Sequence, residues 1–155
     1  MSTYEWLLIG HLLGVFILLM SGGIGGGTGF AVTRATSAAG VVELLKLQRI
    51  SDLYLFSVGG VVAIVFGTLL VDEAGFGYGD AWISAAYTII VVMFAVVHAV
   101  MAPRAKRARE YAETLGTGPV DETLKAKLND PVMNAGGLVL TVSLIVLLWL
   151  MVAKP

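Results

Sequence analysis

Long uncharged stretches alternate with short charged segments along this chain. Four stretches contain no Asp, Glu, Lys or Arg: residues 6–33, 53–71, 81–103 and 131–153. Each reaches the roughly 18 residues with which an α-helix crosses a hydrocarbon core about 30 Å thick. The pattern predicts an all-α membrane protein with four transmembrane helices in one domain, residues 1–155, and spans at about 6–31, 53–71, 81–103 and 131–153.

The first stretch follows an acidic segment, Met1–Glu5. A secretory signal peptide instead begins with positive charge and has an apolar region of about 7–15 residues. We therefore expect this stretch to remain in the protein as a spanning helix.

The connections between the spans carry patterns of their own. Residues 35–52 have side chains at helical spacing that predict a short amphipathic helix lying at the membrane surface. The glycine-rich segment 72–80 predicts a tight turn that makes spans two and three antiparallel neighbours. Residues 104–130 predict two short helices around the sequence GTGP, in a segment too short to form a core alone.

Charge divides the chain between two faces. Nine of the ten Lys and Arg residues lie in the connections 34–52 and 104–130, and only Lys154 lies on the other side. Because cytoplasmic loops are enriched in Lys and Arg, we expect both connections in the cytoplasm and both termini to be extracytoplasmic. The basic cluster after span three suits anionic lipid headgroups, and without interleaved aromatic residues it predicts no nucleic-acid partner.

Composition narrows the chemistry. The chain is 57% hydrophobic and 14% charged, with a mean hydropathy of +0.87, whereas a soluble domain has about a quarter charged residues. It has no cysteine, which excludes disulfides and thiolate metal sites. No carboxylate lies deep in a span, and no acid, base and nucleophile occur together. The sequence therefore favours a non-enzymatic protein and predicts no catalytic residue and no metal site.

Span one ends in SGGIGGGTGF, with six glycines between Ser21 and Phe30. At 100° per residue, one stripe of the helix carries Gly22, Gly25, Gly26 and Gly29. Each glycine costs a helix about 1 kcal/mol relative to alanine in water, and close packing of backbones would offset that cost. We expect another helix, or a flat ligand such as a haem, a quinone or a lipid, to press on this stripe; a local kink is the third interpretation.

The two histidines of the chain, His11 and His98, lie within spans one and three. His11 shares its helical line with Gly29, so we expect it to face the bundle. An ionisable residue in a span is a candidate functional site, whereas a hydrogen bond to a hydroxyl or a carbonyl would make it structural. At 1.5 Å per residue the two histidines differ in depth by about 15 Å, and ligands of one metal lie within about 4 Å of each other, so we expect no shared metal.

Three motifs carry a resemblance to a known family. They are His11 with the following Leu-Leu-Gly, the entry to span two, LQRISDLYLF with GGVV after it, and the ending LWLMVAKP. Over nearly its full length the chain resembles the domain of unknown function 2269 family, uncharacterised bacterial four-helix membrane proteins. The resemblance implies a multi-pass protein of the bacterial cytoplasmic (inner) membrane and implies no activity.

Three functional hypotheses follow. The first is a non-enzymatic accessory or assembly subunit that binds other membrane subunits or itself through the glycine stripe. The second is a redox membrane protein that binds a haem or a quinone at His11 or His98. The third is an oligomeric carrier of a lipid or small molecule.

Overall fold

The computed structural model describes residues 2–154, which are almost entirely helical. The elements are α1 (Thr3–Val32), α2 (Ala38–Ile50), the π-helix η1 (Ser51–Phe56), α3 (Ser57–Glu73), α4 (Ala81–Ala95), the π-helix η2 (Val96–Met101), α5 (Ala102–Leu115), α6 (Glu122–Leu128) and α7 (Pro131–Ala153). Within the described residues, four helices are long and apolar enough to cross a membrane. This confirms the predicted all-α fold with four candidate spans.

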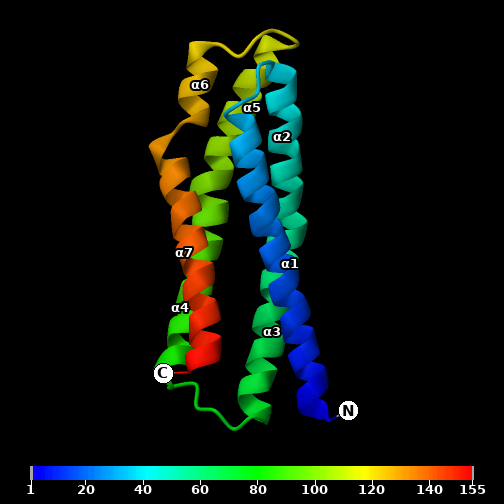
Figure 1. Cartoon of the computed structure of the whole chain (residues 1–155), viewed down its shortest axis with the longest axis vertical. Coiled ribbons are helices and arrows are strands. Elements are labelled where there is room, and N and C mark those ends of the chain that lie inside the picture. Colours follow the sequence, from blue (N-terminus) through cyan, green and yellow to red (C-terminus); the bar gives the residue numbers. More distant parts are fainter. Residues whose placement is uncertain (1, 155) are drawn as a thin grey trace.

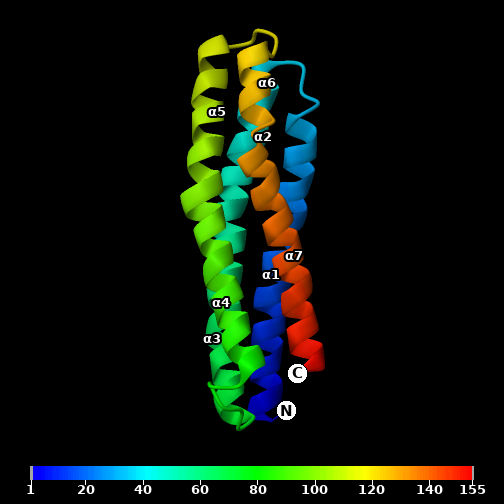
Figure 2. The same ribbon diagram turned by 90° about the vertical axis from the view of Figure 1, so that its left-hand side faces the viewer.

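The helices pair into two hairpins. α1 packs along α3, and α4 packs along α7. The hairpins meet mainly through α2 and α5 at one end, and toward the other end they are joined by a smaller contact of α3 with α4 (Figure 1, Figure 2). We call the first the basic end, because it carries the two Lys- and Arg-rich connections, and the second the terminal end, because both termini lie there.

Glycines allow α1 and α3 to approach closely. A Cβ atom on Gly14 would lie 2.5 Å from the backbone nitrogen of Ala63, and one on Gly59 would lie 2.8 Å from the backbone nitrogen of Leu18. Side chains larger than a hydrogen therefore do not fit at this crossing. Beyond it, the hydroxyls of Ser21 and Ser51 are 3.1 Å apart and buried, which satisfies two polar groups between α1 and η1.

The second and third spans belong to long continuous helices. α2, η1 and α3 form one helix, Ala38–Glu73, and α4, η2 and α5 form another, Ala81–Leu115. The expected amphipathic helix therefore exists, but its predicted place along the membrane surface is wrong: it extends the span in the same direction (Figure 1). The reason is that its apolar face is buried against α5 and α1, so it does not need lipid to cover that face.

The basic end has a small core of its own. Its buried side chains come from α1, α2, α5 and α6: Val32, Ala38, Val41, Val42, Leu45, Ala108, Ala112 and Leu124. Backbone bonds from Ala38 to Gly118 and from Val120 to Thr36 join the two connections. The connection that is too short to fold alone is thus ordered by sharing a core with the other connection, and the two helices expected in it are α5 and α6.

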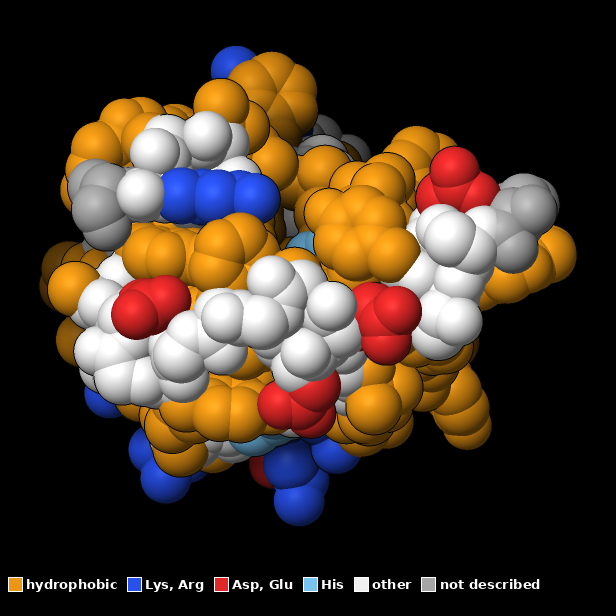
Figure 3. All heavy atoms as spheres, turned by 90° about the horizontal axis from the view of Figure 1, so that it is seen from below, with side chains coloured by type: hydrophobic (Ala, Val, Ile, Leu, Met, Phe, Trp, Pro, Cys, Tyr) orange, Lys and Arg blue, Asp and Glu red, His pale blue; other side chains and the backbone are white. Residues whose placement is uncertain are grey.

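The terminal end is held by the turn between α3 and α4. The hydroxyl of Tyr78 donates to Asp72 at 2.6 Å, and the ammonium of Lys154 lies 4.9 Å from the ring centre of Phe76. Acidic side chains lie across this end of the molecule (Figure 3). The turn makes α3 and α4 antiparallel neighbours, as predicted: the hydroxyls of Thr68 and Tyr87 are 2.6 Å apart, and the ring of Phe94 packs on Gly60. Each of the two helices also packs on the other member of its own hairpin.

We expect Gly14→Ala to lower the thermal unfolding midpoint of the protein in detergent, because the new methyl would collide with the backbone at Ala63. Overpacking of this kind costs about 1–3 kcal/mol. Gly27→Ala is the matched control, since a Cβ there meets no atom within 4 Å. Equal midpoints for the two variants would contradict the close α1–α3 packing.

A pH-dependent contribution is expected at the start of α6. The backbone N–H of Leu124 and the hydroxyl of Tyr111 donate to the Asp121 carboxylate, each at 2.7 Å, and lower the pKa of Asp121 below its usual 3.8. A lowered carboxyl pKa stabilises the fold above the unfolded-state pKa, and this contribution is lost as the pH falls through the lower folded-state value.

Asp121→Ala should therefore speed amide hydrogen exchange across α6 at neutral pH, and Asp121→Asn should speed it less, because asparagine also caps helices. Glu122→Gln is the control, because its pair with Lys125 is solvent-exposed. Unchanged exchange in Asp121→Ala would show that the cap does not hold α6.

Candidate binding site

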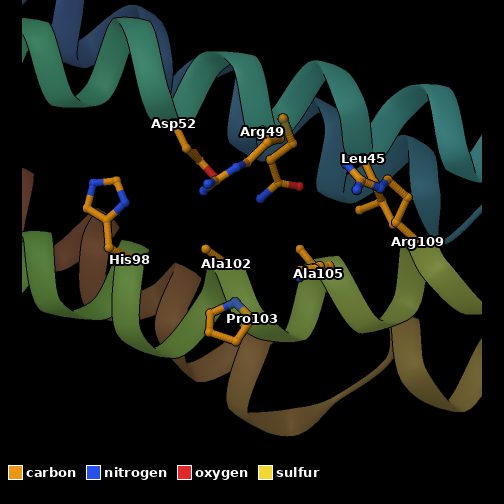
Figure 4. Close-up of a pocket in the computed structure, with 10 residues that line it drawn as sticks. Leu45, Arg49, Asp52, His98, Ala102, Pro103, Ala105 and Arg109 are labelled. Carbon is orange, nitrogen blue, oxygen red and sulfur yellow. The ribbon is translucent and has the colours of Figure 1, made fainter.

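A polar cavity lies where the two hairpins meet at the basic end. It has a volume of about 530 Å³ and opens between α2 and η1 on one side and η2 and α5 on the other (Figure 4). Its walls are formed by Leu45, Gln48, Arg49, Asp52, His98, Ala102, Pro103, Ala105, Lys106 and Arg109. In Figure 4, His98 lies at one end of this cavity, Arg109 at the other, and Arg49 and Asp52 between them.

The two π-helices supply one end of the cavity. η1 carries Asp52 and η2 carries His98, and the two stretches lie opposite each other across the opening (Figure 4). A π-turn inserts one residue into a helix and changes the direction of the side chains that follow it, and such turns are frequent at functional sites. Here the turns place a carboxylate and an imidazole on the same cavity.

A hydrogen-bond chain orients His98. The Ser57 hydroxyl donates to the backbone carbonyl of Asp52 at 2.9 Å and lies 3.1 Å from Nε2 of His98. Because the serine proton is engaged, the Nε2–H of His98 is the donor to Ser57. The ring also packs against Phe56 and Phe94, at centroid distances of 6.1 and 5.8 Å.

Cations line much of the cavity. Arg49 lies in its middle beside Asp52, and Arg109 lies at the end away from His98 (Figure 4). Lys106 also lines the cavity, and Asp52 is the one carboxylate in its wall. Two of the cations also have carboxylates on their outer side: Lys106 lies 3.7 Å from Glu110, and Arg109 lies 3.4 Å from Glu113.

Two donors at the cavity form no hydrogen bond within residues 2–154. The Nε of Arg109 is buried and lies 3.4 Å from Glu113 Oε1, but it forms no hydrogen bond. Gln48 is 8% exposed and its amide forms no hydrogen bond within residues 2–154, but its amide atoms are not among the buried unsatisfied atoms there and so reach open space. A buried polar group without a hydrogen bond is costly, so the Nε of Arg109 favours an oxygen-bearing occupant, whether water or a ligand.

A second cavity of about 240 Å³ lies on the other side of the α2–α5 contact. Gly25, Gly26 and Gly29 line it from α1. Leu45, Gln48 and Ala105 belong to the walls of both cavities, so these three side chains form the partition between them.

The glycine-rich end of α1 is not covered by its own chain. A Cβ on Gly23, Gly25, Gly26, Gly27 or Gly29 would meet no atom within 4 Å, and one on Gly22 would meet only Leu144, at 3.5 Å. The close glycine contacts of α1 are instead at Gly10 and Gly14. Within residues 2–154 no helix therefore packs tightly on Gly25, Gly26 or Gly29, and the helix or flat ligand expected on this stripe stays a prediction.

His11 lies against α3. Its Nδ1 donates to the backbone carbonyl of Ala63 at 2.9 Å, and Gly67 leaves room for the ring. His11 and Gly29 lie on the same side of α1, but their surroundings differ. His11 is covered by α3, whereas Gly29 lines the smaller cavity.

The histidines are held at different points of one helix. Their hydrogen-bond partners, Ala63 and Ser57, are six positions apart along α3, which is about 9 Å at 1.5 Å per residue. The sequence predicted a difference in depth of about 15 Å between the two histidines. Each imidazole has its own hydrogen-bond partner. Within residues 2–154 no three His, Asp or Glu side chains cluster in a way that could hold a metal ion.

Sequence reasoning identified His98 but not the site around it. From the sequence, Arg49 is assigned to membrane topology, Lys106 and Arg109 to topology and to anionic lipid headgroups, and Asp52 to the end of a span. The signal available was their spacing: Arg49 and Asp52, and likewise Lys106 and Arg109, are three residues apart and share a helix face.

These features define an integral membrane protein with four candidate spans in two helical hairpins. A family model described as a predicted integral membrane protein family, DUF2269, matches residues 5–155, so the chain belongs to that family, as the motifs in the sequence indicated. Comparison with curated proteins and with solved structures found no match.

We expect the two imidazoles to carry the donating proton on different ring nitrogens, because His11 donates through Nδ1 and His98 through Nε2. An NMR spectrum of protein labelled with ¹⁵N-histidine contains only two sets of imidazole signals, since the chain has two histidines. Ser57→Ala should shift the His98 signals and leave those of His11 in place, and Gly67→Ala should do the reverse. Two identical tautomers would contradict the hydrogen bonds described above.

Proposed function

We propose that this protein is a non-enzymatic membrane subunit that receives another transmembrane helix on the glycine-rich end of α1. The observation that carries the proposal is the contrast between two groups of glycines on one helix. Gly10 and Gly14 are in tight contact with α3, whereas Gly23 and Gly27 meet no atom within 4 Å.

The uncovered glycines lower the stability of α1 when no partner is present. Each one weakens the helix and leaves no side chain to pack against lipid. Gly23 and Gly27 are exposed and four residues apart, the spacing with which transmembrane helices approach closely. A helix of a second copy or of another membrane subunit would recover the lost packing.

The proposal includes an orientation. The basic end faces the cytoplasm of a bacterial inner membrane, and the termini lie outside it. Nine of the ten Lys and Arg residues support this orientation, because positive residues are retained on the cytoplasmic side.

The redox hypothesis has less support. Nδ1 of His11 is engaged by Ala63 and Nε2 of His98 by Ser57, so each ring would have to give up or share its contact to serve a haem or quinone. The carrier hypothesis draws on the two cavities at the α2–α5 contact, but these lie at the basic end alone.

The test compares association of the wild type with that of the double variant Gly23→Leu, Gly27→Leu. Association of copies is measured by energy transfer between donor- and acceptor-labelled protein in lipid vesicles, and association with other subunits by native electrophoresis of membranes in mild detergent. We expect the wild type to form a complex and the double variant to run as a monomer.

The matched control is Ala95→Leu, Ala99→Leu, which fills another exposed pair of small residues four positions apart. It should associate like the wild type. A monomeric wild type with no co-purifying subunit would remove the proposal, as would equal losses in both double variants.

A further inference from the structure

The larger cavity at the basic end has features of a built anion site that helix association does not explain. Its cations come from two helices that are far apart in sequence: Arg49 from α2, and Lys106 and Arg109 from α5. We propose that this cavity binds the phosphate group of an anionic ligand through Arg49, Lys106 and Arg109.

The donors present match that chemistry. Guanidinium groups bind phosphate oxygens through paired N–H donors, and an ammonium adds a point charge. The Nε of Arg109 lies 3.4 Å from a Glu113 oxygen but forms no hydrogen bond within residues 2–154, and Arg49 lies beside Asp52 (Figure 4) without an ion pair there. A phosphate would give both guanidinium groups an additional oxygen acceptor.

Gln48 adds an amide to the donors of the cavity. It is 8% exposed, lies in the wall of the cavity, and its amide donors have no acceptor among the described residues. A ligand oxygen can accept from this amide while it is held by the arginines.

The carboxylates of the region do not cancel the site. Asp52 lies in the wall, at the part of the cavity toward His98, while Glu110 and Glu113 lie outside the wall and pair with Lys106 and Arg109 at 3.7 and 3.4 Å. Pairs this long and partly solvent-exposed contribute little, so both cations remain able to bind a second anion. Asp52 instead favours a ligand with a hydroxyl or amine near its phosphate, which the carboxylate can accept from.

The phosphate can come from a lipid headgroup or from a soluble molecule. The cavity lies beside the ends of spans two and three, and Leu45, Ala102, Pro103 and Ala105 give its walls an apolar part. Both sources share the phosphate chemistry, and separate arms of one experiment distinguish them.

The experiment uses the full chain in a neutral detergent. Dioleoylphosphatidic acid, dioleoylphosphatidylcholine and glycerol 3-phosphate are titrated separately, and bound molecules are counted by native mass spectrometry. We expect saturable one-to-one binding of the phosphatidic acid, of glycerol 3-phosphate, or of both, and the arm that binds identifies the source. If neither binds to the wild type, the proposal fails.

The site variant is Arg49→Gln, Arg109→Gln, and the matched control is Lys46→Gln, Arg107→Gln. Both remove two charges from the same two helices, but Lys46 and Arg107 do not line the cavity. We expect the site variant to lose at least tenfold in affinity and the control less than threefold. Equal losses would assign the binding to general surface charge and overturn the proposal.

Ala102→Leu provides a second variant if the arginine changes prevent folding. It fills part of the cavity without changing a charge and should weaken binding at least fivefold. Unchanged binding in a folded Ala102→Leu protein, together with unchanged binding in a folded arginine variant, would place the anion elsewhere.

Discussion

The close approach of α1 and α3 at Gly14 and Gly59 is the constraint on which the rest of the structure depends. At this crossing the backbones are so near that a methyl group on either glycine would collide with the other helix. In lipid there is little hydrophobic force between helices, so such packing must come from direct contact. It sets the distance between the two helices of the first hairpin, and α2, which is continuous with α3, packs on the same α1.

The continuity of α2 with α3 determines how the basic end is built. Because α2 continues α3 without a break, its apolar side lies beside α5 and the end of α1, and the four helices there share one core. The hairpins are therefore joined most extensively at this end, and toward the other end α3 and α4 still touch through Thr68 and Tyr87. The polar cavity lies at the junction, and the π-helices η1 and η2 direct Asp52 and His98 toward it.

The glycines of α1 serve two different purposes. Gly14 is buried where α3 crosses, whereas Gly23 and Gly27 are exposed past the crossing. The proposed association and the proposed phosphate site are separate in space as well as in evidence, since the former is on the outside of α1 and the latter between α2 and α5. An experiment that contradicts one of the two proposals does not affect the other.

By itself, the sequence determined the four candidate spans, the helices of the basic connections, and the family. Uncharged length, charge placement and local motifs are properties of contiguous residues, and they can be read without knowing which helices touch. Residues 35–52 show the limit of that reading, because their helical spacing predicted a helix but not its direction.

Only the tertiary structure decided which glycines pack, which groups satisfy His11 and His98, and that Arg49 and Arg109 share a cavity. These facts depend on contacts between residues far apart in sequence, such as His11 with Ala63 and Ser57 with His98. A stripe of glycines looks the same whether α3 covers it or ends short of it. The π-turns likewise rotate the side chains away from a simple helical count, which only the folded chain reveals.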